Sequence, residues 1–328
     1  MLNFKFSFEY LDIKLEYRIY YFRISAYIHL RIRFIICYSF LSILFIKIKL
    51  TIQKVNKFDH FLAKMTDYPY VDCHCHLDAI YEKMKKPLED SFEEFSAPWP
   101  KGFDGCLTTF SDTFEGAMRF IDDGHPLIFG ALGLHPHGAS RYNDEFEAKL
   151  IELLKHPKIR SLGEIGLDYH YTLSPKDVQK TVFEREIKLA VERNLPITIH
   201  TREAEEDTLE ILKRAMPKDH FFHIHCFTDS YNFAEQVLKE WPNSFFGFTG
   251  VLTFKNSKEI QETCSKIPLD RILSETDGPY MAPIPFRGKA AWPGHIPHII
   301  KKIAELHNVK EEEAAATLRE NCRRIYHF

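Results

Sequence analysis

Five short segments of the sequence each place a potential metal ligand at the end of an apolar run. In the first, Asp72-Cys73-His74-Cys75-His76, two histidines are separated by one residue. Side chains two residues apart on a strand project to the same side, so both imidazoles can bind one ion. The remaining four segments supply one candidate each, and these are Glu164, His200, His225 and Asp277. Ligands of these types, each following an apolar run, predict a metal-dependent hydrolase.

The two carboxylates have different expected roles. Glu164 lies in Gly163-Glu164-Ile165-Gly166, where the glycines leave room for a metal or a substrate. Its two oxygens can bridge two ions about 3.5 to 4 Å apart. Asp277 follows the last apolar run and can bind the first ion and accept a proton as a general base. We therefore expect two divalent ions (Zn, Mn or Mg), although a nitrogen-rich set suits Zn, Mn, Fe or Co better than Mg.

The cysteines next to these histidines are predicted to pack, not to bind metal. Alternation along the strand sends Asp72, His74 and His76 to one face and Cys73 and Cys75 to the other. The chain has 7 cysteines, an odd number, and no CxxC pair. This usage is typical of a reduced intracellular compartment, so a cytoplasmic or nuclear location is expected.

The elements that would position these ligands are eight apolar runs alternating with helical periodicity. The runs are Tyr70–His76, Gly105–Phe110, Leu127–Leu134, Ile159–Ile165, Pro196–His200, Phe221–Cys226, Ser244–Phe248 and Arg271–Ser274. Helical spacing is clear over Val178–Arg193, and a terminal helix pair is predicted over Leu306–Tyr326. We expect a single (β/α)8 TIM barrel over residues 65–328, with the metal site at the carboxyl-terminal rim of its strands.

An open, doubly wound sheet is the competing fold. Such a sheet gathers its ligands at one switch point, from a few strands. Here the candidates follow the first, fourth, fifth, sixth and eighth runs, and a closed ring is what brings those together.

The first 64 residues differ in charge from the rest of the chain. They hold 11 Lys/Arg and 4 Asp/Glu, a net +7, and the whole chain carries −3, so the remainder carries −10. An acidic body argues against broad binding of nucleic acid through many phosphate contacts. A small site in which metal ions supply the positive charge is still compatible with it.

Residues 1–64 are predicted to lie outside the folded enzyme or the native protein, with Met65 as the true start. Their most apolar part, residues 34–46, is shorter than the roughly 20 residues of a membrane-spanning helix. Membrane contact through this part is therefore a minor alternative. A signal peptide is not expected either, because the apolar run begins deep in the chain and no small-residue cleavage site follows it.

Six motifs together resemble the TatD-type metal-dependent nucleases, a branch of the amidohydrolase-like barrels, and in particular the animal second TatD domain-containing type. The motifs start at Val71 (VDCHCHLD), Gly133 (GLHPH), Gly163 (GEIGLDY), Ile199 (IHTREA), His225 (HCFT) and Glu275 (ETDGPY). The resemblance implies a two-metal phosphodiesterase, typically a DNase acting from the 3′ end, with RNA as a further substrate. It implies a first ion on His74, His76, Glu164 and Asp277, and a second on Glu164, His200 and His225.

On this basis Asp277 and Glu164 are the expected catalytic residues, and the expected partner is nucleic acid, single-stranded or at an end. No stable protein partner is implied. Candidates to hold phosphate are His135, His137, Arg202 and Arg287. An Asn that many members carry after Arg-Gly-Lys is absent here, where Ala290 follows Lys289.

Two alternatives stay open at the level of sequence. One is an amidohydrolase-type enzyme acting on a small amide, on a lactone or by deamination, and the other is a non-catalytic binding protein. Many small-molecule amidohydrolases carry a carbamylated lysine on the fourth strand. Glu164 stands there in this chain, which favours phosphodiester hydrolysis.

Overall fold

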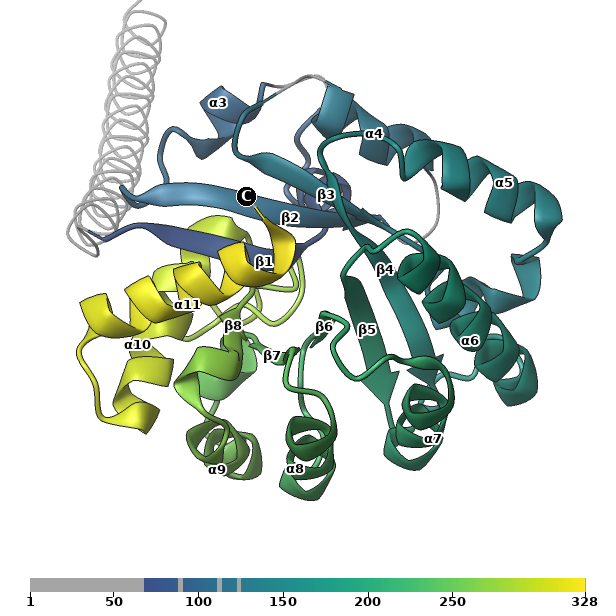
Figure 1. Ribbon diagram of the computed structural model, residues 1–328. Helices are drawn as coiled ribbons and strands as arrows, with labels where there is room; N and C mark the ends of the chain where they lie inside the picture. The colour runs from purple at the N-terminus through teal and green to yellow at the C-terminus, as the bar shows by residue number, and fades with distance from the viewer. Residues whose placement is uncertain (1–67, 88–90, 111–113, 123–124, 328) are drawn as a thin grey trace, which may run out of the picture. The chain divides into compact units, whose positions relative to one another are not determined.

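Eight parallel strands form one sheet in the order β1 to β8, as the computed structural model shows (Figure 1). The structure describes residues 68–87, 91–110, 114–122 and 125–327. The strands are β1 (Tyr70–Cys75), β2 (Phe103–Phe110), β3 (Ile128–Leu132), β4 (Ile159–Asp168), β5 (Ile197–Arg202), β6 (Phe222–Ile224), β7 (Ser244–Phe248) and β8 (Ile272–Ser274). Every predicted run contains one of them or overlaps it closely, and the predicted barrel is confirmed.

Helices surround the strands (Figure 1). They are α2 (Leu77–Lys83), α3 (Phe92–Ser96), α4 (Phe114–Asp122), α5 (Asp144–Leu153), α6 (Lys176–Glu192), α7 (Glu205–Ala215), α8 (Tyr231–Glu240), α9 (Lys258–Lys266), α10 (Ile296–His307) and α11 (Glu311–Tyr326). The helical spacing predicted α6 within two residues. The terminal pair begins ten residues earlier than predicted, at Ile296, and Pro297 occupies its first turn, where proline is tolerated.

The barrel closes where the chain leaves β8 and runs beside β1. The backbone N–H of Asp277 donates to the carbonyl of His74 at 3.0 Å, and the N–H of His76 donates to the carbonyl of Gly278 at 2.9 Å. The buried carboxylate of Asp72 accepts from the backbone N–H and the hydroxyl of Thr276 at 3.0 and 2.6 Å. These bonds place Asp277 directly beside the two histidines of β1.

The predicted alternation along β1 is broken. A register shift between Asp72 and Cys75 inserts a bulge in the pairing with β2, and a bulge reverses which face the following residues point to. Cys73 packs with Leu107 and Leu273 of other strands, inside the barrel, whereas Cys75 packs in the separate core between the strands and the outer helices. The two cysteines therefore do not share a face, although both pack in apolar clusters as expected.

Helix α11 covers the amino-terminal ends of the strands. Its residues Cys322, Ile325 and Tyr326 join the barrel-interior cluster of Val71 and Cys73. The Tyr326 hydroxyl lies 2.8 Å from Nδ1 of His223, so the helix also contacts a polar group in the barrel. With this end filled by side chains, the open end of the barrel is the carboxyl-terminal rim.

The predictions for residues 1–64, including their boundary at residue 65 and the apolar part at 34–46, fall outside the described residues and stay predictions. Within the described part of the chain, no helix combines the length and apolarity needed to cross a membrane.

Candidate metal centre

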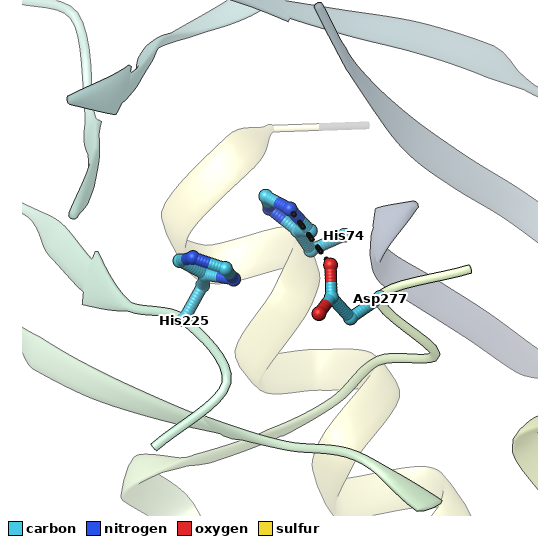
Figure 2. Close-up of side chains that lie close together, drawn as sticks. All are labelled: His74, His225 and Asp277. Carbon is cyan, nitrogen blue, oxygen red and sulfur yellow. Dashed lines mark ion pairs between the residues drawn. The ribbon is translucent and has the colours of Figure 1, made fainter. Parts of the chain in front are cut away.

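A first group of ligand candidates gathers at the seam between β1 and the end of β8. The Nε2 atoms of His74 and His76 are 3.3 Å apart, and Oδ1 of Asp277 lies 3.7 and 3.4 Å from them. Figure 2 shows His74 and Asp277 pointing toward each other, with His225 beside them. Oxygen Oε2 of Glu164 lies 3.6 Å from His74 and 3.8 Å from His76, which completes the group.

A second group surrounds the other oxygen of the same carboxylate. Oε1 of Glu164 lies 2.7 Å from Nδ1 of His200 and 2.7 Å from Nε2 of His225. Those two nitrogens are 3.1 Å apart. His225 also stacks on His74, with ring centroids 4.1 Å apart, so it borders both groups. Glu164 thus presents one oxygen to each group, the arrangement expected of a bridging ligand.

His135 joins the second group, although the sequence suggested a phosphate contact for it. Its Nε2 lies 3.5 Å from Oε1 of Glu164, and its ring meets that of His200 edge-on at 4.6 Å. Together with Glu164 and His200 it forms one of three clusters of potential metal ligands in the described residues.

The glycines around Glu164 serve packing between strands. A Cβ on Gly163 would lie 2.6 Å from Cβ of Thr198, and one on Gly166 would lie 1.9 Å from the carbonyl oxygen of His200. Both glycines also have positive φ, 158° and 144°, which disfavours any side chain. The space that the sequence suggested for a metal or a substrate is therefore occupied by β5. Close contact with β5 brings Glu164 within reach of His200.

The carboxylates and imidazoles of the centre shift one another's pKa values against the effect of burial. Burial alone would raise the pKa of Glu164, but His225, His135 and His200 hold it well below its usual range, so the group is a carboxylate. Burial alone would lower the pKa of His76, yet Asp277 and Glu164 raise it to about 9. For His200, Asp168 and Glu164 outweigh burial and also raise the pKa to about 9. The carboxylates of this centre therefore stabilise positive charge on the neighbouring imidazoles. They would stabilise bound metal cations in the same way.

Asp168 is a site residue that the sequence reasoning missed. Its Oδ2 lies 3.2 Å from Nε2 of His200 and 3.0 Å from Nε2 of His137. Its Oδ1 accepts from the backbone N–H groups of His170 and Tyr171, both at 3.0 Å. Strand β4 extends to this residue, three beyond the predicted end, and an even spacing from Glu164 could have indicated it. Asp168 orients His200 so that Nδ1 faces Glu164.

Glu275 contacts the segment that carries His225. One of its oxygens accepts from the backbone N–H of Cys226, and the other lies 2.9 Å from Nε2 of His223. His223 and Glu275 are both fully buried. A Cβ on Gly247 would lie 2.2 Å from the His223 ring, so this glycine makes room for the pair. His223 therefore lies deeper than the metal ligand candidates, beside Tyr326 of α11.

The centre opens into a pocket of about 910 Å³ at the carboxyl-terminal rim, within the size range of ligand sites. Of the four residues expected to hold phosphate, His135, His137 and Arg202 line it. Arg202 also lies 5.0 Å from the centroid of the Tyr171 ring. Arg287 lines an adjoining groove instead and packs over Phe254 at 4.5 Å.

The donor set and its spacing fit two divalent ions. Two ligands of one ion at about 2.1 Å lie about 3 to 3.5 Å apart in tetrahedral or octahedral geometry. In the first group the donor atoms are 3.3 to 3.8 Å apart, and in the second 2.7 to 3.1 Å. Burial of a carboxylate among so many imidazoles is costly unless charges are paired, and metal ions would provide that pairing.

Comparison with known proteins agrees with this geometry. A family model described as TatD related DNase matches residues 71–327. The chain belongs to this family. Relatives of known sequence support the TatD assignment. The 3'-5' RNA nuclease TATDN2 of Homo sapiens is 41% identical over 267 residues, which is 78% of this chain but 35% of the human protein. YabD of Bacillus subtilis, an uncharacterized metal-dependent hydrolase, is 40% identical over 260 residues, or 78% of this chain and 98% of YabD.

Solved structures show the same TatD fold. YJJV, a TatD homologue from Escherichia coli, has a TM-score of 0.70 at 24% identity and covers 79% of this chain and 98% of its own. A TatD family hydrolase from Entamoeba histolytica has a TM-score of 0.69 at 20% identity, over 79% and 98% of the two chains. Membership of the TatD family, with the buried clusters of His, Glu and Asp, identifies the chain as a metal-dependent hydrolase.

Proposed function

We infer that this TatD-family chain is a two-metal nuclease that hydrolyses phosphodiester bonds in single-stranded nucleic acid, DNA or RNA, from a 3′ end. One observation carries the proposal: the two oxygens of Glu164 face two separate groups of ligand candidates. Two ions about 3.5 to 4 Å apart are the arrangement used for in-line displacement at phosphorus. The name of the human relative, a 3'-5' RNA nuclease, supports action from a 3′ end and supports RNA as a substrate.

In this proposal His74, His76, Glu164 and Asp277 hold the first ion, and Glu164, His200 and His225 hold the second. When bound, such ions lower the pKa of a water molecule and neutralise charge on a phosphoryl group. The metals proposed are Zn or Mn, with Mg third, because nitrogen ligands outnumber oxygen ligands in this set.

The protein side chains would then position the reaction. Asp277, whose side chain is 10% exposed and lines the pocket, accepts the proton of the attacking water. Arg202 lines the pocket and can bind two oxygens of a phosphate with its planar guanidinium group. His137, held at 3.0 Å by Asp168, presents its ring at the same pocket and would contact a neighbouring phosphate oxygen. Asp168 also holds the proton on Nε2 of His200, so Nδ1 is the nitrogen that would lose its proton and bind metal.

The test is hydrolysis of single-stranded DNA and RNA of the same sequence, each labelled at the 5′ end, by the metal-loaded protein. A ladder of products shortened from the 3′ end is expected, and excess chelator should abolish it. Asp277→Asn should lower the rate by about 10²–10⁴-fold, because it removes the general base. Asp219→Asn, a substitution at an exposed position, is the matched control and should keep full activity.

Two results would refute the proposal. Hydrolysis that persists in excess chelator would exclude the metal centre as its source. Absence of hydrolysis on every nucleic acid, together with turnover of a lactone or a cyclic amide, would assign the chain to small-molecule chemistry on the same barrel.

A further inference from the structure

Two grooves adjoin the metal pocket at the carboxyl-terminal rim, and they differ in charge. The first, which we call the acidic groove, shares Arg202 and Thr228 with the pocket. The second, which we call the cationic groove, shares Ala79, Tyr280 and Met281 with it. When one phosphodiester of a nucleic-acid strand lies at the metal centre, the rest of the strand must leave the pocket. These grooves are two candidate paths for it.

The acidic groove is lined by seven carboxylates and two cationic side chains. Glu203, Glu205 and Glu206 follow β5 and begin α7, while Glu259 and Glu262 lie on α9. One of the two cations, Lys266, is paired with Glu262 at 2.6 Å. A row of phosphates in this groove would face like charges at short range, which is unfavourable.

The cationic groove has the opposite balance. Lys83 ends α2, Lys85 follows it, and Arg287 and Lys289 lie in the segment after β8; all four are exposed. Among the described residues, Glu82 is the single carboxylate that lines the groove. Within the described part of the chain, Lys83, Lys85 and Arg287 form no ion pair. These cations are therefore available to phosphates, which favour Lys and Arg as partners.

An exposed aromatic ring stands at the junction between the metal pocket and the cationic groove. Tyr280 is 58% exposed and lines both spaces. Its ring meets that of His76 edge-on at 6.4 Å, so it borders the first group of metal ligand candidates. Exposed aromatic rings beside a cationic track are the features that bind unpaired bases and phosphates of a single strand.

We propose that the cationic groove, formed by Lys83, Lys85, Arg287 and Lys289, binds the part of a single-stranded nucleic acid that extends away from the bond being cut, with Tyr280 stacking on a base at the junction. The charge of the acidic groove keeps the strand from leaving by that path. This inference rests on the proposed nuclease function and adds to it the path of the substrate. Such a short track also fits a chain whose body is acidic overall.

The experiment compares wild type with the double variant Lys83→Glu/Arg287→Glu on single-stranded oligonucleotides of increasing length, with a dinucleotide as the shortest substrate. For wild type we expect KM to fall as the strand grows long enough to reach the groove. Each cation that binds a phosphate contributes about 0.7 to the slope of log affinity on log salt, which is about fivefold in affinity at roughly 0.1 M salt. The double variant removes two such cations and should therefore raise KM for long strands by about 25-fold. The dinucleotide should be cleaved by the variant at the wild-type rate.

The matched control is Lys213→Glu/Lys301→Glu, which makes the same change of charge at exposed lysines that line neither groove nor the metal pocket. It should keep the length dependence of wild type. The inference is overturned if the groove variant and this control have the same KM for long strands, or if the dinucleotide is affected as strongly as the long strand. Wild-type protein that cleaves neither substrate would overturn the proposed function itself.

Discussion

Replacement of Asp168 by Asn should selectively weaken one of the two metal sites. Asp168 is 1% exposed, and each of its oxygens accepts bonds: one faces Nε2 of His200 and His137, and the other accepts two backbone N–H groups. An amide has one acceptor oxygen and one NH2 donor. In either orientation of the substituted side chain, its NH2 group would face groups that themselves donate. The variant therefore loses a charge-assisted bond in a buried place whichever way the amide turns.

The expected loss of metal affinity can be worked out from the hydrogen bond that the variant lacks. A hydrogen bond to a charged group contributes about 1.5–3 kcal/mol, and a partner that orients a metal-bound histidine is typically worth about 10–100-fold in metal affinity. At about 1.4 kcal/mol per factor of ten, the two ranges agree. We expect the site formed by Glu164, His200 and His225 to weaken by about 10–100-fold. The site formed by His74, His76, Glu164 and Asp277 contains no residue that Asp168 orients, so it should keep its affinity.

Calorimetric titration of metal into the metal-free protein measures both sites. Wild type should bind two equivalents, and Asp168→Asn should bind one with unchanged affinity and one more weakly. Asp207→Asn is the matched control: Asp207 accepts from Tyr169 and pairs with Lys180, and neither partner is a metal ligand candidate. Binding of both equivalents to Asp168→Asn with wild-type affinities would refute the argument that this carboxylate orients His200.

Three further results are expected. The pKa values of His76 and His200 are raised to about 9 in the metal-free centre, so below pH 9 both rings are mainly cationic imidazolium and must lose a proton to bind metal. Metal binding should therefore release protons and weaken as pH falls. Calorimetry in buffers of different ionisation enthalpy measures this, and an absence of proton release at pH 7 would contradict it. Gly247→Ala should lower the free energy of unfolding by about 1–3 kcal/mol, because the Cβ of the alanine would overlap the buried pair His223 and Glu275. Urea unfolding measures this, and an unchanged midpoint would contradict it. A divalent ion at about 100 times its Kd should raise the free energy of unfolding by about 2.7 kcal/mol per site, measured by the same urea unfolding, and no shift of the midpoint would argue against binding to the folded state.

The sequence predicted the barrel well because the pattern that indicates it is repeated along most of the chain. Eight β-rich runs alternating with helical spacing extend over many residues, and single errors do not change the count. Local features were less predictable. The bulge in β1 is set by pairing with β2, so alternation counted along one strand assigned Cys73 and Cys75 to the same face. The length of β4 depends on its pairing with β5, where Asp168 pairs with Arg202, and this partner was not visible from β4 alone.

The residues of the candidate site could be selected by type and position, but their grouping depends on the fold. Glu164 was expected to bridge two ions, and each of its oxygens does face a separate set of histidines. His135 was expected to hold phosphate, and it lines the pocket, but nothing in its motif shows that it also lies 3.5 Å from Glu164. For Arg287 the sequence order placed it after the last strand, yet the chain carries it into a neighbouring groove. The directions in which side chains point at the rim, and the distances between them, depend on how the whole barrel is assembled. No single sequence segment determines them.

The seam where Asp277 meets His74 and His76 joins the first and last strands of the ring. Of the four donors of the first site, His74 and His76 therefore come from one end of the domain, whereas Asp277 comes from about 200 residues later in the chain. A growing polypeptide that has emerged from the ribosome through β7 holds both histidines but lacks this partner. The first site is thus completed only when β8 has been synthesised and docked. An ion bound there would link β1 to the segment after β8. It would therefore oppose any opening of the barrel that separates the first strand from the last.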